Sequence, residues 1–271
     1  MPLSRLRLRP VSTRAVPRLI DAEARVPAPV PTEEELERET EKLVKRLTKL
    51  QRVFYADGRY ALLIVLQGRD ASGKDGTIRK VFGAVNPQGC VVHSFRAPND
   101  VERQHDYLWR IHQRVPPTGM IGIFNRSQYE DILVPRVRRL VPPAVWRERY
   151  AHINDFERML AANGVVIRKF MLHISRAEQK RRFKDRLNDP DKQWKFRRGD
   201  LDDRRHWRTF TGAYRDILRR TSTRWAPWYV VPADDKDVRN HLIARVLVET
   251  LGGLGLRYPE PDEDLDGITI E

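Results

Sequence analysis

The chain has 271 residues, of which 40% are hydrophobic and 32% are charged, so it can bury one large α/β core or two small ones. No apolar stretch approaches the roughly 20 residues that a membrane-spanning helix needs, and the single cysteine, Cys90, excludes an internal disulfide and a cysteine metal cluster. Lysine and arginine outnumber aspartate and glutamate by 51 to 37, and this net charge of +14 favours polyanionic partners: nucleic acid, a membrane surface or a phosphate-rich substrate.

Residues 1–31 are rich in proline and arginine and show no sustained period, which predicts a basic, flexible N-terminal arm. The start lacks the apolar core of a secretory signal, although its arginine-rich, acid-poor composition is also compatible with an organelle transit peptide. We expect a cytoplasmic protein.

A capping box marks the start of the first helix, with Thr32 as the N-cap and Glu35 at the third helical position. Leucines at helical spacing continue the helix to residues 57–58, where an Asp-Gly pair ends it.

A glycine-rich loop at residues 68–76 follows an apolar run, predicted as a strand over 60–67, and precedes a predicted helix over 77–84. Its sequence, GRDASGKDG, fits the G-x-x-x-x-G-K part of the Walker A phosphate-binding loop, whose backbone N–H groups cradle phosphate oxygens. Asp75 stands where a Ser or Thr ordinarily binds Mg²⁺, and the alternative is a chance glycine-rich match. The residues expected to bind phosphate or nucleotide here are Gly68, Arg69, Ala71, Ser72, Gly73, Asp75 and Gly76.

The rest of the chain alternates predicted strands and helices, which is typical of a parallel sheet covered on both faces. The expected strands are 90–95, 120–124, 165–174 and 228–231, and the expected helices run from 99 or 100 to 112 and over 144–163, 200–220 and 235–251. The predicted fold is therefore an α/β, P-loop kinase-like, three-layer α/β/α sandwich with a five-stranded parallel sheet and a helical lid. The kinase domain is expected over 32–255, with an acidic C-terminal tail over 256–271.

Charged residues follow the ends of these strands, where ligands of parallel sheets bind. Asp70 in the loop is interpreted as a Mg²⁺ ligand, because an acid beside phosphates is repulsive without a metal; the alternative is a loop-shaping aspartate. Asn125 replaces the usual Mg²⁺-binding Asp after the third strand, so either Asp70 supplies most of the anionic coordination or Glu130 and Asp131 contribute. Arg126 could clamp a transferring phosphoryl group, or be an ordinary surface residue.

The densest basic segment, at about 175–200, follows the fourth strand. A basic helix at this edge is typical of a mobile lid that excludes water, whereas the alternative is a solvated surface. The lid residues expected to contact polyanion are Arg182, Arg186 and Lys195.

Three motifs, at 68–76, 124–137 and 189–204, resemble the polyphosphate kinase 2 family, and the similarity extends over roughly 32–255. The resemblance implies a P-loop kinase that passes phosphate between inorganic polyphosphate and nucleotides with Mg²⁺. It also implies that Asp70 and Lys74 are the family's loop residues and that Arg126 is its arginine after the third strand. The form FNRSQYED is similar to the subgroup that phosphorylates nucleoside monophosphates as well as diphosphates.

The resulting hypothesis is a reversible polyphosphate:AMP/ADP phosphotransferase. It requires Mg²⁺, with Mn²⁺ as a candidate substitute, and the resemblance implies a homodimer or homotetramer. Its catalytic residues are Asp70, Lys74 and Arg126, and its metal ligands are Asp70, Asn125 and Asp131. The alternatives are an ordinary ATP-dependent nucleoside or nucleotide kinase and, in a different class, a basic nucleic-acid-binding protein.

Overall fold

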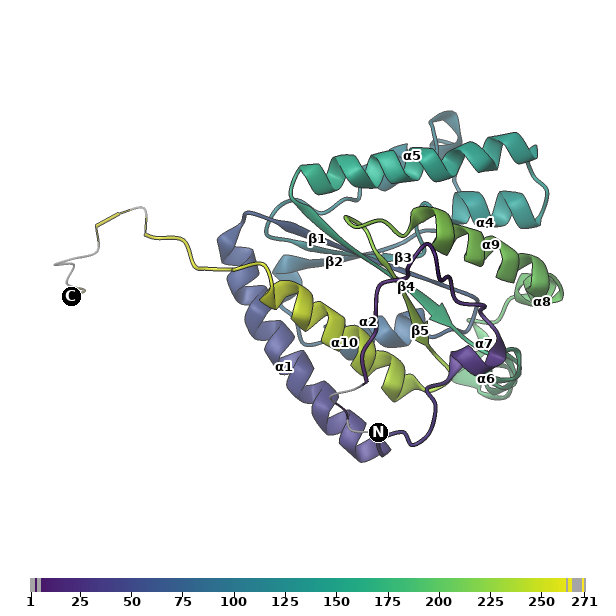
Figure 1. The fold of residues 1–271 in the computed structure, drawn as a ribbon, viewed down its shortest axis with the longest axis horizontal. Coiled ribbons are helices and arrows are strands. Elements are labelled where there is room, and N and C mark those ends of the chain that lie inside the picture. Colours follow the sequence, from purple (N-terminus) through teal and green to yellow (C-terminus); the bar gives the residue numbers. More distant parts are fainter. Residues whose placement is uncertain (1–2, 4–5, 262, 265–269, 271) are drawn as a thin grey trace.

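Five parallel strands form one sheet at the centre of the protein (Figure 1). The computed structural model describes residues 3, 6–261, 263–264 and 270. The strands are β1 (Ala61–Gly68), β2 (Cys90–Ser94), β3 (Ile121–Asn125), β4 (Val165–His173) and β5 (Trp228–Pro232). Their order is β2-β3-β1-β4-β5, and each bound agrees with the predicted strand to within one residue. The predicted parallel sheet is confirmed.

Helices cover both faces of the sheet, which confirms the predicted three-layer arrangement (Figure 1). One face carries α1 (Glu33–Asp57), α2 (Lys74–Phe82) and α10 (Lys236–Gly252), and the other carries α4 (Glu130–Val137), α5 (Pro143–Ala162) and α9 (Trp207–Thr221). Alternate residues of β1 enter the two cores, Leu62 and Ile64 on the first face and Leu63 and Val65 on the second. The apolar run is therefore buried on both sides, as expected for a central parallel strand.

The remaining helices are short or lie beyond the ends of the strands. Between β4 and α9 the chain forms α6 (Arg176–Asn188), α7 (Pro190–Gln193) and α8 (Arg198–Arg205). The other short elements are α3 (Trp109–His112) and the 3₁₀ helices η2 (Asp21–Ala24), η3 (Pro87–Gly89) and η4 (Glu102–Gln104). No helix in the described ranges is long and apolar enough to cross a membrane.

Side-chain caps set the helix boundaries that the sequence predicted. The Thr32 hydroxyl accepts the Glu35 N–H at 3.2 Å and the Glu35 carboxylate accepts the Thr32 N–H at 3.0 Å, so the capping box is confirmed. Gly58 ends α1 in the left-handed conformation, with φ of 65°. Ser175 caps α6, and Asp235 caps α10.

Two predicted helices are interrupted. The helix expected from residue 99 or 100 to 112 is wrong, because the Asp106 carboxylate accepts the N–H groups of Leu108 and Trp109 and separates η4 from α3. The helix expected over 200–220 breaks at His206, where α8 ends and α9 begins. The side chain of Trp207, the first residue of α9, packs against Arg69 of the loop, which fixes where the second helix starts.

The N-terminal segment, which the sequence predicts as a flexible arm, contacts the body of the protein at several residues between 6 and 24. Leu6, Leu19 and Ala24 are buried, and the Val11 N–H donates to the Trp228 carbonyl at 2.8 Å. In Figure 1 this segment runs along the body beside β5. Residues 1–2 and 4–5 of the predicted arm, and 262, 265–269 and 271 of the predicted acidic tail, lie outside the described residues.

A buried ion pair joins β4 to α5. Lys169 Nζ lies 2.5 Å from Glu157 Oε2, and both side chains are wholly buried. The ammonium also donates to the Tyr129 hydroxyl at 2.7 Å and the Thr221 carbonyl at 2.8 Å, while Gln128 donates to the carboxylate at 3.0 Å. Burial raises the pKa of Glu157 and lowers that of Lys169, and their contact opposes both shifts. Each partner therefore stabilises the charged form of the other.

Removing either Lys169 or Glu157 should therefore lower the free energy of unfolding. We expect Lys169→Met to lower the free energy of unfolding by about 3–5 kcal/mol, because it leaves the Glu157 carboxylate buried and unpaired. Urea denaturation measures the loss. Arg168→Met is the matched control, since that neighbouring half-buried side chain donates to Thr250 and should cost only about 1 kcal/mol. Equal losses in the two variants would contradict the assignment.

Candidate active site

The loop between β1 and α2 has the backbone form that the motif predicts. Ala71 and Gly73 have φ of 62° and 101°, which allows the chain to turn sharply before α2 begins at Lys74. A side chain on Gly68 would place its Cβ 2.7 Å from the Leu172 carbonyl oxygen of β4, so only glycine fits there. The loop therefore lies against the carboxyl ends of β1 and β4, with the N-terminus of α2 behind it.

Lys74 is folded back over the loop. Its Nζ donates to the carbonyl oxygens of Gly68 at 2.8 Å and Arg69 at 3.3 Å, and only 8% of the residue is exposed. Burial lowers the pKa of Lys74 to about 8, and the nearby Arg126 guanidinium lowers it further against the attraction of Asp70. The ammonium is held by neutral carbonyl groups, so an anion can compete for it.

Asp70, Arg126 and Glu130 form an ion-pair network beside the loop. Arg126 Nη2 lies 2.6 Å from Asp70 Oδ1, and Nη1 lies 3.3 Å from Glu130 Oε2. Arg126 has φ of 65°, a left-handed conformation that is strained for an arginine and typical of functional positions. The carboxylates of Glu130 and Asp70 raise the pKa of Arg126, so the guanidinium remains charged. The structure brings together the predicted catalytic trio of Asp70, Lys74 and Arg126.

Asn125 and Asp75, the two departures from an ordinary P-loop enzyme, face each other. Asn125 Nδ2 donates to Asp75 Oδ1 at 2.8 Å. In an ordinary P-loop enzyme the residue at the position of Asp75 carries a hydroxyl, and the residue at the position of Asn125 carries a carboxylate. In this chain the first position carries the carboxylate and the second carries a neutral amide. The pair thus keeps one carboxylate and one neutral oxygen donor at this edge.

Asp131 is not brought to the loop. Its carboxylate lies 3.3 Å from Arg110 Nη2, and its backbone carbonyl accepts a hydrogen bond from Arg149. Burial raises the pKa of Asp131, against the opposing effect of Arg110. The prediction that Asp131 binds a metal would require its carboxylate to leave Arg110. Over the described ranges no three His, Cys, Asp or Glu side chains gather to hold a metal ion.

Arg182 supports the loop from α6, and four of its five N–H groups donate to other groups of the protein. Its Nη1 donates to the Ala71 carbonyl at 2.9 Å, its Nη2 to the carbonyls of Ala233 and Asp234 at 2.8 Å, and its Nε to Glu178 at 2.8 Å. Contact of Arg182 with polyphosphate stays a prediction, and these bonds leave one Nη1 N–H group for it. Gln179, one turn earlier, donates to the Asp70 carbonyl at 3.0 Å, a contact that no local pattern indicated.

The other two predicted lid residues are closer to solvent. Arg186 Nη1 lies 3.6 Å from Asp200 Oδ2, which links α6 to α8. Burial and the negative charge of Asp70 raise the pKa of Asp200 to about 6, so the acid lies near the site. The Lys195 ammonium lies 4.9 Å from the centre of the Trp194 ring, and Trp194 is 77% exposed. Contact of Arg186 and Lys195 with polyanion stays a prediction.

Arg69 also differs from the prediction, because its side chain leaves the loop and meets α9. The guanidinium lies 3.9 Å from the centre of the Trp207 ring and donates to the Trp207 carbonyl at 3.0 Å and the Thr211 hydroxyl at 2.6 Å. Burial lowers the pKa of Arg69 to about 10. The side chain therefore connects the loop to the segment that follows the lid.

A cavity lies beside the Asp70–Arg126 pair, between the loop, α4, α6 and the start of α9. It offers about 30 Å³ to water, room for about two molecules and too little for a phosphate group. A wider groove of about 440 Å³ lies between residues 106–113 and Phe156 and contains no loop residue. Asp70, Arg126 and Glu130 line the smaller cavity.

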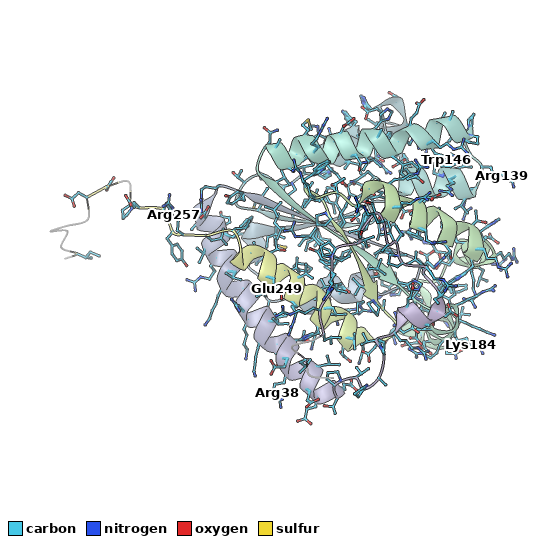
Figure 2. The ribbon with its side chains drawn as sticks, viewed as in Figure 1. Arg38, Arg139, Trp146, Lys184, Glu249 and Arg257 are labelled. Atoms are coloured by element: carbon cyan, nitrogen blue, oxygen red, sulfur yellow. The ribbon has the colours of Figure 1, made fainter. Side chains whose placement is uncertain are left out.

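The basic surplus of the chain is spread over its surface. Figure 2 shows Arg38 on α1, Arg139 beyond α4, Lys184 on α6 and Arg257 beyond α10 projecting from separate parts of the molecule. The positive charge of the site comes instead from the few buried and half-buried side chains around the loop.

The sequence matches the family model of Polyphosphate kinase 2 (PPK2) over residues 31–254. This chain belongs to the polyphosphate kinase 2 family. Two curated relatives of this PPK2 chain each align over 229 residues. The AMP/ADP-polyphosphate phosphotransferase of Meiothermus ruber is 55% identical and covers 84% of this chain and 86% of its own. The ADP-polyphosphate phosphotransferase of Rhodopseudomonas palustris is 44% identical, with 80% and 79% covered.

The fold is shared with a solved member of the PPK2 family. The crystal structure of polyphosphate kinase 2 from Arthrobacter aurescens TC1 superimposes with a TM-score of 0.87 at 39% identity, covering 98% of this chain and 94% of that one. The resemblance stated from three motifs is thereby confirmed for the family and its fold.

The lowered pKa of Lys74 predicts how anion binding depends on pH in this PPK2 chain. Since the ammonium form binds phosphate, affinity for tripolyphosphate should stay level below about pH 8 and fall toward about tenfold per pH unit above it. Titration calorimetry without metal between pH 7 and 10 measures this. Lys74→Arg keeps its charge throughout and should remove the decline. The same decline in both proteins would show that another group titrates.

Proposed function

We propose that this chain transfers phosphoryl groups reversibly between inorganic polyphosphate and AMP or ADP. The observation that carries the proposal is the convergence of Lys74, Arg126 and the loop at one sheet edge, in a chain 55% identical to an AMP/ADP-polyphosphate phosphotransferase. Phosphoryl transfer needs little more from a protein than positioning and neutralisation of negative charge. Lys74 and Arg126 at this edge supply the positive charge that phosphoryl transfer requires.

Each residue of the trio has a distinct task in the proposed reaction. The N–H groups at the start of α2 and the Lys74 ammonium hold the phosphates next to the transferred group. Arg126 leaves Asp70 and turns to the transferring phosphoryl, whose developing charge it stabilises, while Glu130 keeps the guanidinium near the site. The acceptor phosphate oxygen attacks directly, so no covalent enzyme intermediate is needed.

The donors at the loop fit a divalent metal that keeps most of its waters. Mg²⁺ binds through one or two carboxylates together with substrate phosphates and water. Asp70, Asp75 and the amide oxygen of Asn125 are the oxygen donors near the loop, and we propose that they hold Mg²⁺ or Mn²⁺ directly or through water. The metal supplies charge neutralisation across the phosphates. Asp70 would hold the metal in place of its present partner, and the Arg126 guanidinium, now 2.6 Å from Asp70, would then be available to phosphate.

The nucleotides that we propose as acceptors are those in the name of the more similar relative. The Meiothermus ruber protein is named for both AMP and ADP, and it is more similar to this chain than the Rhodopseudomonas palustris protein, which is named for ADP. We therefore propose that this chain accepts both. The dimer or tetramer implied by the family resemblance stays a prediction.

Turnover with purified protein tests the proposal. With Mg²⁺, long-chain polyphosphate and AMP, the protein should form ADP and then ATP, and chromatography measures both products. With ADP in place of AMP, it should form ATP. Lys74→Ala should lower the rate by about 10²–10³-fold, because a charge at the transferring phosphates is lost.

Lys80→Ala is the matched control, because that lysine lies on the same helix but is 40% exposed and paired with Glu37. Its rate should equal that of the unaltered protein. Phosphorylation with ATP as the donor and none with polyphosphate would identify an ordinary nucleotide kinase instead. Full activity of Lys74→Ala would refute the role of the loop.

A further inference from the structure

A buried arginine from the C-terminal helix lies directly beneath the phosphate loop. Arg239 of α10 is 4% exposed, and its Nε and Nη2 share one acceptor, the Asn240 side-chain oxygen, at 3.3 and 3.1 Å. Its Nη1 lies 3.5 Å from the Ser72 carbonyl oxygen, which is long for a hydrogen bond. No carboxylate of the described residues forms an ion pair with it. A full positive charge is thus buried with weak, neutral partners.

The glycines of the loop make the space that this guanidinium occupies. A Cβ on Gly73 would lie 2.0 Å from Arg239 Nη1, and a Cβ on Gly76 would lie 3.5 Å from Nη2. The guanidinium therefore packs against the first turn of α2, where two glycines three residues apart leave room for it. Gly76, expected to bind phosphate, has instead this contact on its buried side.

Burial of an unpaired cation is unfavourable unless another group compensates for it. Burial lowers the pKa of Arg239 to about 10, the neighbouring Arg182 guanidinium lowers it further, and Asp237 and Asp235 oppose these effects. The side of the loop opposite Arg239 is where the N–H groups of the loop and Lys74 receive phosphate in the proposed function. A bound polyanion would add negative charge to that of Asp235 and Asp237, which act on Arg239 without forming an ion pair with it in the described residues.

The contact with Ser72 also bears on the geometry of the loop. In a trans peptide the C=O of one residue and the N–H of the next point in opposite directions. Since the Ser72 carbonyl faces Arg239, the Gly73 N–H faces away from it, toward the phosphate side of the loop. Arg182 holds the preceding carbonyl, that of Ala71, at 2.9 Å. Two arginines from different helices thus hold successive loop carbonyls on one side.

We propose that Arg239 is a positioning residue for phosphate binding, which orients the Ser72–Gly73 peptide and gives the loop a positive charge that the bound phosphate chain neutralises. This inference rests on the proposed function only in taking the loop as the phosphate site. Arg239 does not touch the transferring group, so its loss should raise the KM for polyphosphate far more than it lowers kcat.

Calorimetric binding of tripolyphosphate to the full chain tests the charge requirement. Arg239→Met should weaken binding about tenfold or more, the effect of removing a unit charge some 10 Å from the phosphates at an effective dielectric constant of about 20. Arg239→Lys should retain affinity within about threefold, because it keeps the charge. Arg168→Met is the matched control, since it removes a half-buried arginine that meets α10 at Thr250 and not at the loop.

Thermal unfolding of the same variants shows whether a loss of affinity accompanies a general loss of stability. Unchanged affinity in Arg239→Met would overturn the inference, as would equal losses of affinity in Arg239→Met and Arg239→Lys. The proposed function fails separately, if the unaltered protein binds no tripolyphosphate or if Lys74→Ala binds it equally well. Tight binding that requires Lys74 but not Arg239 would reject the inference alone.

Discussion

A binding site for a phosphate chain must hold positive charge in place before the anion arrives. The structure meets this constraint by giving each cation at the loop a temporary or neutral partner. Lys74 donates to carbonyl groups, Arg126 pairs with Asp70 and Glu130, and Arg239 lies against the backbone of α2. The partners of Lys74 and Arg239 are neutral, whereas Arg126 is paired with two carboxylates. The remaining positive potential is what a polyanion would occupy.

The parallel sheet explains why these groups meet. Residues that follow β1 and β3 arrive at one edge, and the register pairs Leu66 of β1 with Asn125 of β3. The buried strands fix the position of that edge, and α6 and α10 then support the loop from beneath through Arg182 and Arg239. The precision of the site thus depends on packed helices more than on the loop sequence itself. A positioned loop needs no reorganisation when charge develops during transfer.

Local patterns predicted the elements of the fold well, because each depends on residues close in sequence. The residues that cause an element to form lie within that element in three cases: the Thr32 capping box, the apolar run of β1 and the glycine-rich loop. The helix expected from residue 99 or 100 failed for the same kind of reason, since the competing Asp106 cap was overlooked. The packed N-terminal segment could not be predicted, because its few apolar residues have no period and find their partners across the whole chain.

The structure brings the predicted site residues together where a motif fixes the backbone, whereas other predicted side chains contact groups that are distant in sequence. Arg69 meets Thr211, 142 residues away, and Arg182 meets Ala71, 111 residues away. A basic residue near phosphates was read as a phosphate ligand, yet both arginines bind protein groups. Asp131 pairs with Arg110 for the same reason, since a buried carboxylate takes the nearest cation. Sequence alone does not reveal which cations remain available to a ligand.

The most direct test is a crystal structure of the protein with tripolyphosphate and Mn²⁺, in which anomalous scattering locates the metal. The predicted result is a metal bound by Asp70 directly or through one water, phosphate oxygens at Lys74 and the α2 N-terminus, and Arg126 turned from Asp70 to phosphate. A metal held by Asp131, or tripolyphosphate bound elsewhere with the Asp70–Arg126 pair intact, would contradict the assignment of the site.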